Sequence, residues 1–127
     1  HVVLFNGDGS AVMDMPSLVS AAEFGLHNLR VVVLDNESYG IVQQFEELQG
    51  FSTKCTADRL NPNFADLASA CGWPSTYEFL DGDLEMFARR VLASPGPTLA
   101  HVRVADHAVW PIMEGGKRPD EMTVGPT

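Results

Sequence analysis

The chain has 127 residues, of which 45% are hydrophobic and 20% are charged, and its formal net charge at pH 7 is −9. This length and apolar content allow one globular domain, or part of one, to bury a core, and they exclude a disordered chain. The negative charge argues against nucleic acid or an anionic membrane as a main partner, and it would repel a phosphorylated ligand unless a cation or helix dipoles intervened.

The first half of the chain alternates strand-like and helix-like segments. The apolar run 1–6, rich in β-branched residues, predicts a buried strand, and residues 16–25 predict a helix. Residues 29–36, with the sequence LRVVVLDN, form the strongest strand signal in the chain. Residues 39–50 predict a short helix that carries its apolar side chains on one side.

The second half continues this alternation. Residues 61–72 predict a helix with Asn61 as its N-cap, because an asparagine side chain accepts hydrogen bonds from the N–H groups of a first turn. A strand over 76–80, a helix over 83–94 and a strand over 98–105 follow. Strands that alternate with helices require parallel crossovers, so we expect an α/β fold: an open, mostly parallel sheet with helices on both faces.

We expect the chain to form one α/β domain over residues 1–105, followed by a tail over 106–127 that is rich in proline and glycine. His1 already lies inside the apolar run of the first predicted strand. We therefore also expect further sequence upstream, in a cleaved segment, in a partner chain or in a longer polypeptide of which this chain is a trimmed fragment.

The cysteines and the hydropathy pattern indicate a cellular compartment. Cys55 and Cys71 lie in no metal or redox spacing, which indicates free thiols in a reducing compartment. The sequence contains no apolar run of membrane-spanning length and no leader peptide. We therefore expect a cytoplasmic protein.

Polar residues follow the first two predicted strands, as the loop NGDGS and the loop DNESYG. The carboxyl ends of parallel strands meet at one edge of a sheet, where ligands bind, so we expect Asp8 and Asn36 to face one site. A carboxylate, an amide oxygen and a loop carbonyl form the hard oxygen set that suits Mg²⁺, which takes further ligands from substrate phosphates. We predict that Asp8 holds a cation that contacts phosphate, while Gly7 and Gly9 let the backbone approach.

Other interpretations of these loops are weaker. The first loop lacks the third glycine of the dinucleotide fingerprint, and an EF-hand loop that starts at Asn6 fails because its sixth position is Ala11. An EF-hand loop that starts at residues 81–85 also fails, because its twelfth position, which requires glutamate, is Leu92. Two unrelated loops that use Asp, Asn and Gly for turn geometry remain an open alternative. His101 has no ligand spacing to another histidine, and we expect it to be packed or partly exposed and not catalytic.

The triplet GDG and the later segment NLRVVVLDNESYG together resemble the cofactor-binding signature of the enzymes that use thiamine diphosphate, also called thiamine pyrophosphate. In that family, slightly under thirty residues separate the triplet from a strand that ends in two asparagines, and here 28 positions separate Asp8 from Asn36. The pair is Asp35-Asn36, which retains the second, metal-binding asparagine. The segments YGIVQQFEEL, NPNFADLASACGW and VWPIMEGGKRPDEM are similar to segments of acetolactate synthases and their relatives. The resemblance covers essentially the whole chain, as the latter part of the C-terminal pyrophosphate domain.

The resemblance implies roles for individual residues. Asp8 and Asn36 would bind Mg²⁺ through side-chain oxygens, and Ser38 would bind it through its backbone carbonyl. The positions implied at the diphosphate are Gly7, Gly9, Ser10, Tyr39 and Gly40. The positions implied to face the substrate are Ile41, Val42 and Phe45. Phe45 stands where acetolactate synthases usually carry tryptophan, a departure at the position that helps select their acceptor.

The resemblance also implies an activity: a lyase or carboligase component that depends on thiamine diphosphate and Mg²⁺ and acts on a small 2-oxo acid. The reaction would be decarboxylation, with or without acyl transfer of the acetolactate synthase kind. The activating glutamate and the pyrimidine-binding site would come from another domain or chain in an oligomer, so no catalytic side chain is expected in this chain. The alternative is a non-catalytic scaffold or regulatory subunit that retains the fold.

Overall fold

The computed structural model of the chain describes residues 1–52, 56–57 and 59–105. The chain divides into two compact units. The sheet unit consists of His1–Asn36 and Asn61–Val104, and the second unit contains Glu37–Leu60.

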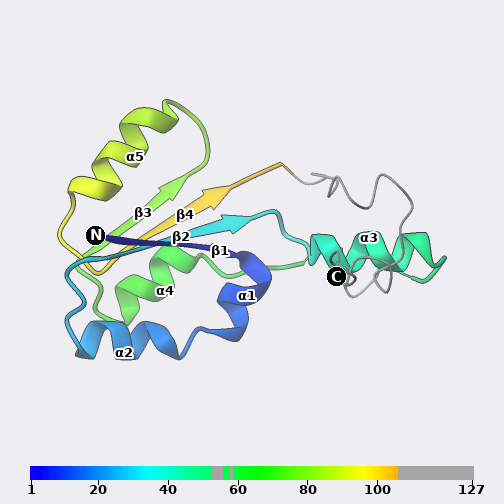
Figure 1. Cartoon of the computed structure of the whole chain (residues 1–127), viewed down its shortest axis with the longest axis horizontal. Coiled ribbons are helices and arrows are strands. Elements are labelled where there is room, and N and C mark those ends of the chain that lie inside the picture. The colour runs from blue at the N-terminus through cyan, green and yellow to red at the C-terminus, as the bar shows by residue number, and fades with distance from the viewer. Residues whose placement is uncertain (53–55, 58, 106–127) are drawn as a thin grey trace, which may run out of the picture. The chain divides into compact units, whose positions relative to one another are not determined.

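The described residues form four strands and five helices (Figure 1). The strands are β1 (Val2–Gly7), β2 (Leu29–Asp35), β3 (Ser75–Phe79) and β4 (Thr98–Arg103). The helices are α1 (Asp8–Met13), α2 (Ser17–Glu23), α3 (Gly40–Leu48), α4 (Phe64–Ala70) and α5 (Leu84–Ala93). None of the helices in the described ranges has both the length and the apolar character that a membrane crossing requires.

The strands form one sheet in the order β1-β2-β4-β3, and every neighbouring pair is parallel. The register sets Val2 opposite Leu29, and Thr98 opposite both Arg30 and Ser75. All strands therefore end at the same edge of the sheet. The predicted open parallel sheet is confirmed.

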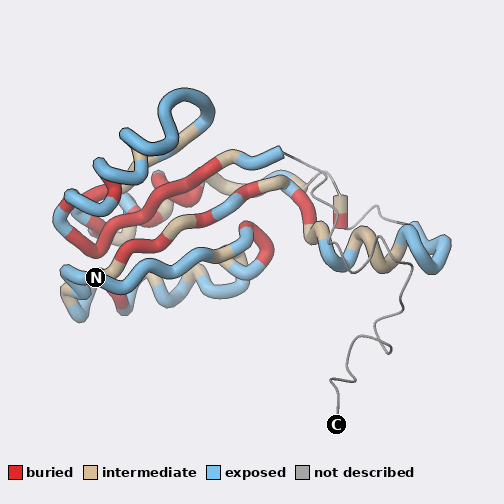
Figure 2. The backbone as a smooth tube through the Cα atoms, turned by 45° about the horizontal axis from the view of Figure 1, so that its top comes forward, coloured by how far each residue is buried: buried red, intermediate tan, exposed pale blue. Residues whose placement is uncertain are grey.

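Helices cover both faces of the sheet, also as predicted: α1, α2 and α4 pack on one face and α5 packs on the other (Figure 1). The larger core lies between the sheet and the helices α1, α2 and α4. Its buried members are Ala21, Val31, Val33, Phe64, Ala65, Ala68, Trp73 and Leu99. The smaller core lies under α5 and consists of Val91, Ala100 and Val102. Burial is greatest along the central strands, whereas β1 is exposed along most of its length (Figure 2).

Two helix starts differ from the prediction. The segment that begins at Asp8 was predicted to be a loop, but it is the first turn of α1, although a glycine inside a helix costs about 1 kcal/mol relative to alanine. Packing of Ala11 and Val12 against the larger core offsets that cost. The predicted N-cap at Asn61 was wrong: α4 is capped by Asn63, whose side chain accepts hydrogen bonds from two backbone N–H groups of the first turn.

A buried arginine anchors the amino-terminal edge of the sheet. Arg30 is 2% exposed, and its Nη1 donates to the carbonyl oxygens of His27 and Leu29, each at 2.9 Å. Its Nη2 donates to the carbonyl of Ser94 at 2.5 Å, and its Nε donates to the carbonyl of Val91 at 3.2 Å. These last two carbonyls lie at the C-terminal end of α5, where the helix dipole favours a cation. Arg30 therefore joins the start of β2 to the end of α5.

We expect Arg30→Met to lower the free energy of unfolding by roughly 3 kcal/mol, because it leaves buried carbonyl groups without their charged donor. Urea unfolding measures this change. The control is Arg89→Met on α5, which removes an exposed arginine paired with Glu85 and is expected to change stability by less than about 1 kcal/mol. Equal losses of stability in the two variants would contradict the anchoring role.

Candidate functional site

Two aspartates come together at the carboxyl-terminal edge of the sheet. The register sets Gly7 of β1 opposite Leu34 of β2. The next residue of each segment, Asp8 and Asp35, therefore lies at the end of one of two neighbouring strands. Asp8 is 3% exposed and Asp35 is fully buried. Two buried acidic groups at one edge of the sheet need hydrogen-bond donors or cations around them.

Asn61 bridges these two aspartates. Its Nδ2 donates to Asp8 Oδ2 at 2.5 Å and to Asp35 Oδ1 at 2.8 Å. Because ionised carboxylates only accept hydrogen bonds, the NH₂ group of the amide must face both of them. The other end of the amide, Oδ1, is buried and has no hydrogen-bond partner among the residues that the structure describes. The bridge therefore leaves the amide that contacts Asp8 with a buried and unsatisfied acceptor.

Asp35 is held from β4 as well. His101 Nε2 lies 2.7 Å from Asp35 Oδ2, and Arg103 Nη1 lies 3.5 Å from the same oxygen. His101 is 1% exposed, and its ring meets the ring of Phe64 edge-on at 5.2 Å between centroids. The prediction that His101 packs is confirmed, and its packing supports the site.

Burial raises the pKa of Asp8 above the ordinary value of an aspartate, and the nearby charge of Asp35 raises it further. The hydrogen bonds that Asp8 accepts from Asn61 and from the backbone N–H of Gly9, the latter at 2.8 Å, lower the pKa and only partly offset the effect of burial. A cation beside this carboxylate would favour its ionised form.

The groups at this edge fit a hydrated divalent cation. In the part of the chain that the structure describes, no three His, Cys, Asp or Glu side chains are placed to hold a metal, so a cation there needs amide or carbonyl oxygens besides Asp8. Mg²⁺ keeps several waters, and a bound water donates hydrogen bonds. The unpartnered Oδ1 of Asn61 is a suitable acceptor for such a water.

The other predicted metal ligands lie next to these groups in the chain. Asn36 follows Asp35 directly and is half-buried. Ser38, in the second unit, is 4% exposed. Their joint binding of a cation with Asp8 stays a prediction.

The first loop contributes three predicted diphosphate positions, all at the start of α1. Gly7 is the N-cap residue and has ordinary extended backbone angles, so its conformation does not require glycine. A Cβ atom at Gly7 would meet nothing within 4 Å among the described residues, which leaves room for a ligand beside the backbone. Gly9 is buried in the first turn, and Ser10 is exposed.

The second loop contributes the start of α3 in the second unit. Tyr39 is the N-cap residue of α3, and its N–H donates to the carbonyl of Thr56 at 2.8 Å. The guanidinium of Arg59 lies 3.7 Å from the centre of the Tyr39 ring, and Gly40 begins the helix. Among the predicted substrate-facing residues, Ile41 is 58% exposed, Val42 is 48% exposed and Phe45 is half-buried. These side chains are accessible, but their role stays a prediction.

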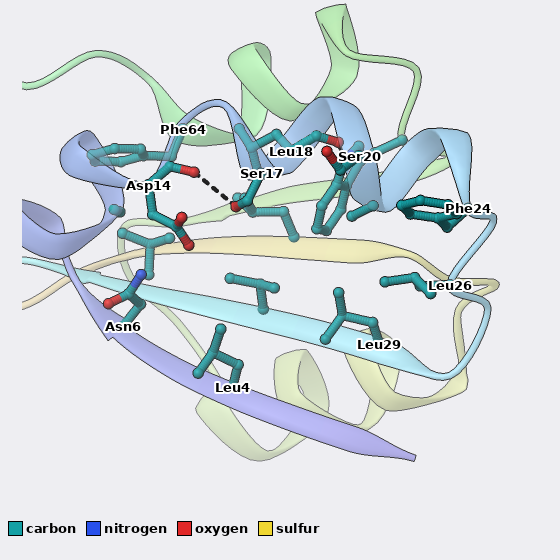
Figure 3. A pocket seen from close by; sticks show the side chains of 16 residues that line it. Leu4, Asn6, Asp14, Ser17, Leu18, Ser20, Phe24, Leu26, Leu29 and Phe64 are labelled. Atoms are coloured by element: carbon teal, nitrogen blue, oxygen red, sulfur yellow. Dashed lines mark hydrogen bonds between the residues drawn. The ribbon is translucent and has the colours of Figure 1, made fainter.

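A separate apolar cavity of about 260 Å³ lies between α2 and the sheet (Figure 3). Leu4, Leu18 and Leu29 point into it, and the hydrogen bond drawn there joins Ser17 Oγ to the carbonyl oxygen of Asp14 at 2.7 Å. The cavity does not include the bridged aspartates, and the described residues that line it include no cationic group for a phosphate. The carboxyl-terminal edge of the sheet is therefore the better candidate for the functional site.

The site contains residues that sequence reasoning missed. The sequence pattern predicts Asn61 as a helix cap and indicates Asp35 only as the first member of the Asp35-Asn36 pair. One signal for Asn61 was present in the sequence NPN: two asparagines flank Pro62, and only one of them can cap the helix.

Comparisons with known proteins agree on one family. Residues 1–102 match the family model described as "Thiamine pyrophosphate enzyme, C-terminal TPP binding domain". The chain is 34% identical over 125 residues to the acetolactate synthase isozyme 2 large subunit of Escherichia coli K12, which covers 95% of this chain and 22% of that protein. It is 30% identical over 121 residues to the mitochondrial acetolactate synthase catalytic subunit of Saccharomyces cerevisiae, covering 94% of this chain and 18% of that protein.

Among solved structures, the chain is similar to a thiamine diphosphate-dependent 4-hydroxybenzoylformate decarboxylase of Rhodococcus jostii RHA1. The TM-score is 0.68 and the sequence identity 25%, and the match covers 86% of this chain and 20% of that one. The chain therefore spans about a fifth of the length of the relatives that it matches.

We expect the stability of the chain without divalent cations to depend on the ionisation of Asp8. Because folding raises the pKa of Asp8, folding favours the protonated form, and stability is lost as the pH rises through that raised pKa. Asp8→Asn removes the titration, so the stability of this variant relative to the wild type should increase from pH 3.5 to pH 7.

Urea unfolding at a series of pH values in EDTA measures this difference. The charge-matched control is Asp14→Asn, which removes an exposed carboxylate one residue after α1. A difference between Asp8→Asn and the wild type that stays constant over the whole pH range would contradict the assigned effect of burial.

Proposed function

The chain belongs to the thiamine pyrophosphate enzyme family, as part of the C-terminal cofactor-binding domain, and we propose that it binds thiamine diphosphate through Mg²⁺ held by Asp8, Asn36 and the backbone carbonyl of Ser38. The observation that carries this proposal is the buried carboxylate of Asp8 at the end of β1, beside a second buried carboxylate and an unpartnered amide oxygen. Such a set of groups attracts a cation and repels a free anion.

The charge of the chain supports the need for a cation. The diphosphate carries several negative charges, and the chain itself carries a net charge of −9. Direct binding of the diphosphate next to Asp8 and Asp35 would bring like charges together. We therefore infer that the cofactor binds only with a divalent cation, while Gly7, Gly9, Ser10, Tyr39 and Gly40 contact the diphosphate.

We propose that the enzyme acts on a small 2-oxo acid, as a decarboxylase or as a carboligase of the acetolactate synthase kind. When bound, thiamine diphosphate supplies the carbon that attacks the oxo group and the ring that accepts the electrons left by carbon dioxide. The part of this chain is to hold the cofactor through the cation and to line the substrate's approach with apolar side chains. Ile41 and Val42 are exposed on α3, and with Phe45 they suit that second role.

The chain is expected to be one component of a larger active site. Its relatives are about five times longer, and the pyrimidine-binding site and the activating glutamate would come from another domain or chain in an oligomer. We accordingly expect cofactor binding to tighten in the presence of that component.

The first test is calorimetric titration of thiamine diphosphate into the chain, with Mg²⁺ and then with EDTA. Asp8→Ala should weaken Mg²⁺-dependent binding by about 100-fold or more and leave the fold intact, because the side chain that holds the cation is lost. Asp14→Ala, which removes an exposed carboxylate near the same helix, should bind as the wild type does. The titration is repeated after mixing with any co-purifying protein.

Two results would contradict the proposal in different ways. Wild-type affinity in Asp8→Ala would refute the metal assignment while leaving the cofactor assignment in place. Absence of binding in the wild type, with and without partner protein, would favour a scaffold or regulatory subunit that retains the fold.

A further inference from the structure

Asn61 lies just before α4, and the residues that follow it constrain its backbone. Its neighbour Pro62 has a fixed φ angle, and Asn63 caps α4 with its own side chain. The next residue, Phe64, is 1% exposed and packs against the ring of His101. Because the helix is already capped, the amide of Asn61 is not needed by α4.

That amide uses both of its hydrogen atoms on carboxylates. One NH₂ group donates to Asp8 Oδ2 at 2.5 Å and to Asp35 Oδ1 at 2.8 Å, and both bonds are of the stronger, charge-assisted kind if the carboxylates are ionised. With both donors engaged, the orientation of the planar amide is determined. Its Oδ1 then lies buried, and no donor from the described part of the chain reaches it.

The two carboxylates differ in how firmly they are held. Asp35 is fixed independently of Asn61, by His101 at 2.7 Å and Arg103 at 3.5 Å. Among the described residues, Asp8 accepts hydrogen bonds from Asn61 and from the backbone N–H of Gly9, one on each oxygen. Asn61 therefore ties the orientation of Asp8 to the fixed position of Asp35. Since a carboxylate oxygen has two acceptor positions, each oxygen of Asp8 can still bind a cation.

We propose that Asn61 is a positioning residue for the cation site: it orients the Asp8 carboxylate, and its Oδ1 accepts a hydrogen bond from a water on the bound cation. This inference rests on the proposed function, because it assigns Asn61 to the cation that Asp8 would hold. Groups that orient a metal ligand in this way typically contribute 10- to 100-fold to metal affinity.

The test compares two neighbouring asparagines with different tasks. Binding of Mn²⁺ is followed by the loss of the free-ion EPR signal, in the presence of saturating thiamine diphosphate, and thermal unfolding is recorded for the same samples. Asn61→Ala should weaken Mn²⁺ binding by roughly 10- to 100-fold. Asn63→Ala removes the cap of α4, so it should lower the melting temperature and leave Mn²⁺ affinity within about twofold of the wild type.

A second variant keeps the inference testable if Asn61→Ala does not fold. Asn61→Gln keeps an amide but displaces it by one methylene, so its Mn²⁺ affinity should fall below that of the wild type and above that of a folded Asn61→Ala.

The outcomes separate this inference from the proposed function. If the wild type binds Mn²⁺, Asp8→Ala does not, and both Asn61 variants bind as tightly as the wild type or more tightly, the positioning role is overturned and the function stands. If the wild type itself binds no Mn²⁺, with and without the partner protein, both are overturned. Weakened binding in the Asn61 variants, with affinity retained in Asn63→Ala, supports the positioning role.

Discussion

Two aspartates end neighbouring parallel strands and lie almost entirely out of solvent, so the groups around them must compensate their charge. The register of β1 and β2 leaves no freedom to separate Asp8 from Asp35. The amide of Asn61 donates hydrogen bonds to both carboxylates. From β4, His101 and Arg103 contact the carboxylate of Asp35. This arrangement brings together three segments: the start of α1, the segment before α4 and the end of β4.

The two edges of the sheet use buried charge for different purposes. At the amino-terminal edge, the guanidinium of Arg30 bonds to backbone carbonyls of the protein itself and closes the structure there. At the carboxyl-terminal edge, Asn61 Oδ1 has no partner among the described residues, and there is room beside the backbone at Gly7. Ligands of open parallel sheets bind at that second edge, in agreement with this difference.

The proposed dependence on another domain or chain accords with the surface of the sheet unit. In the described part of the chain, β1 pairs with β2 alone, and its residues Val2–Phe5 are 41% to 67% exposed. Beside α5, an apolar groove of about 500 Å³ runs along Val3, Phe5 and Leu34. An exposed apolar edge strand is a template for pairing, and large exposed apolar patches commonly mark interaction sites. A chain that spans about a fifth of its relatives' length fits a component of a larger assembly.

The amino-acid sequence by itself determined the alternation of strands and helices, the parallel sheet and the family, because these depend on apolar periodicity and on a motif with fixed spacing. It also indicated Asp8 as a site residue, since an aspartate after a strand is visible locally. Only the tertiary structure decided that Asp8 begins a helix and that Asn61 bridges two carboxylates and does not cap α4. The hydrogen bond from Asn61 to Asp8 joins residues 53 positions apart, and the one between Asp35 and His101 joins residues 66 apart. No local pattern records such contacts, because they exist only once the sheet has brought its strand ends together.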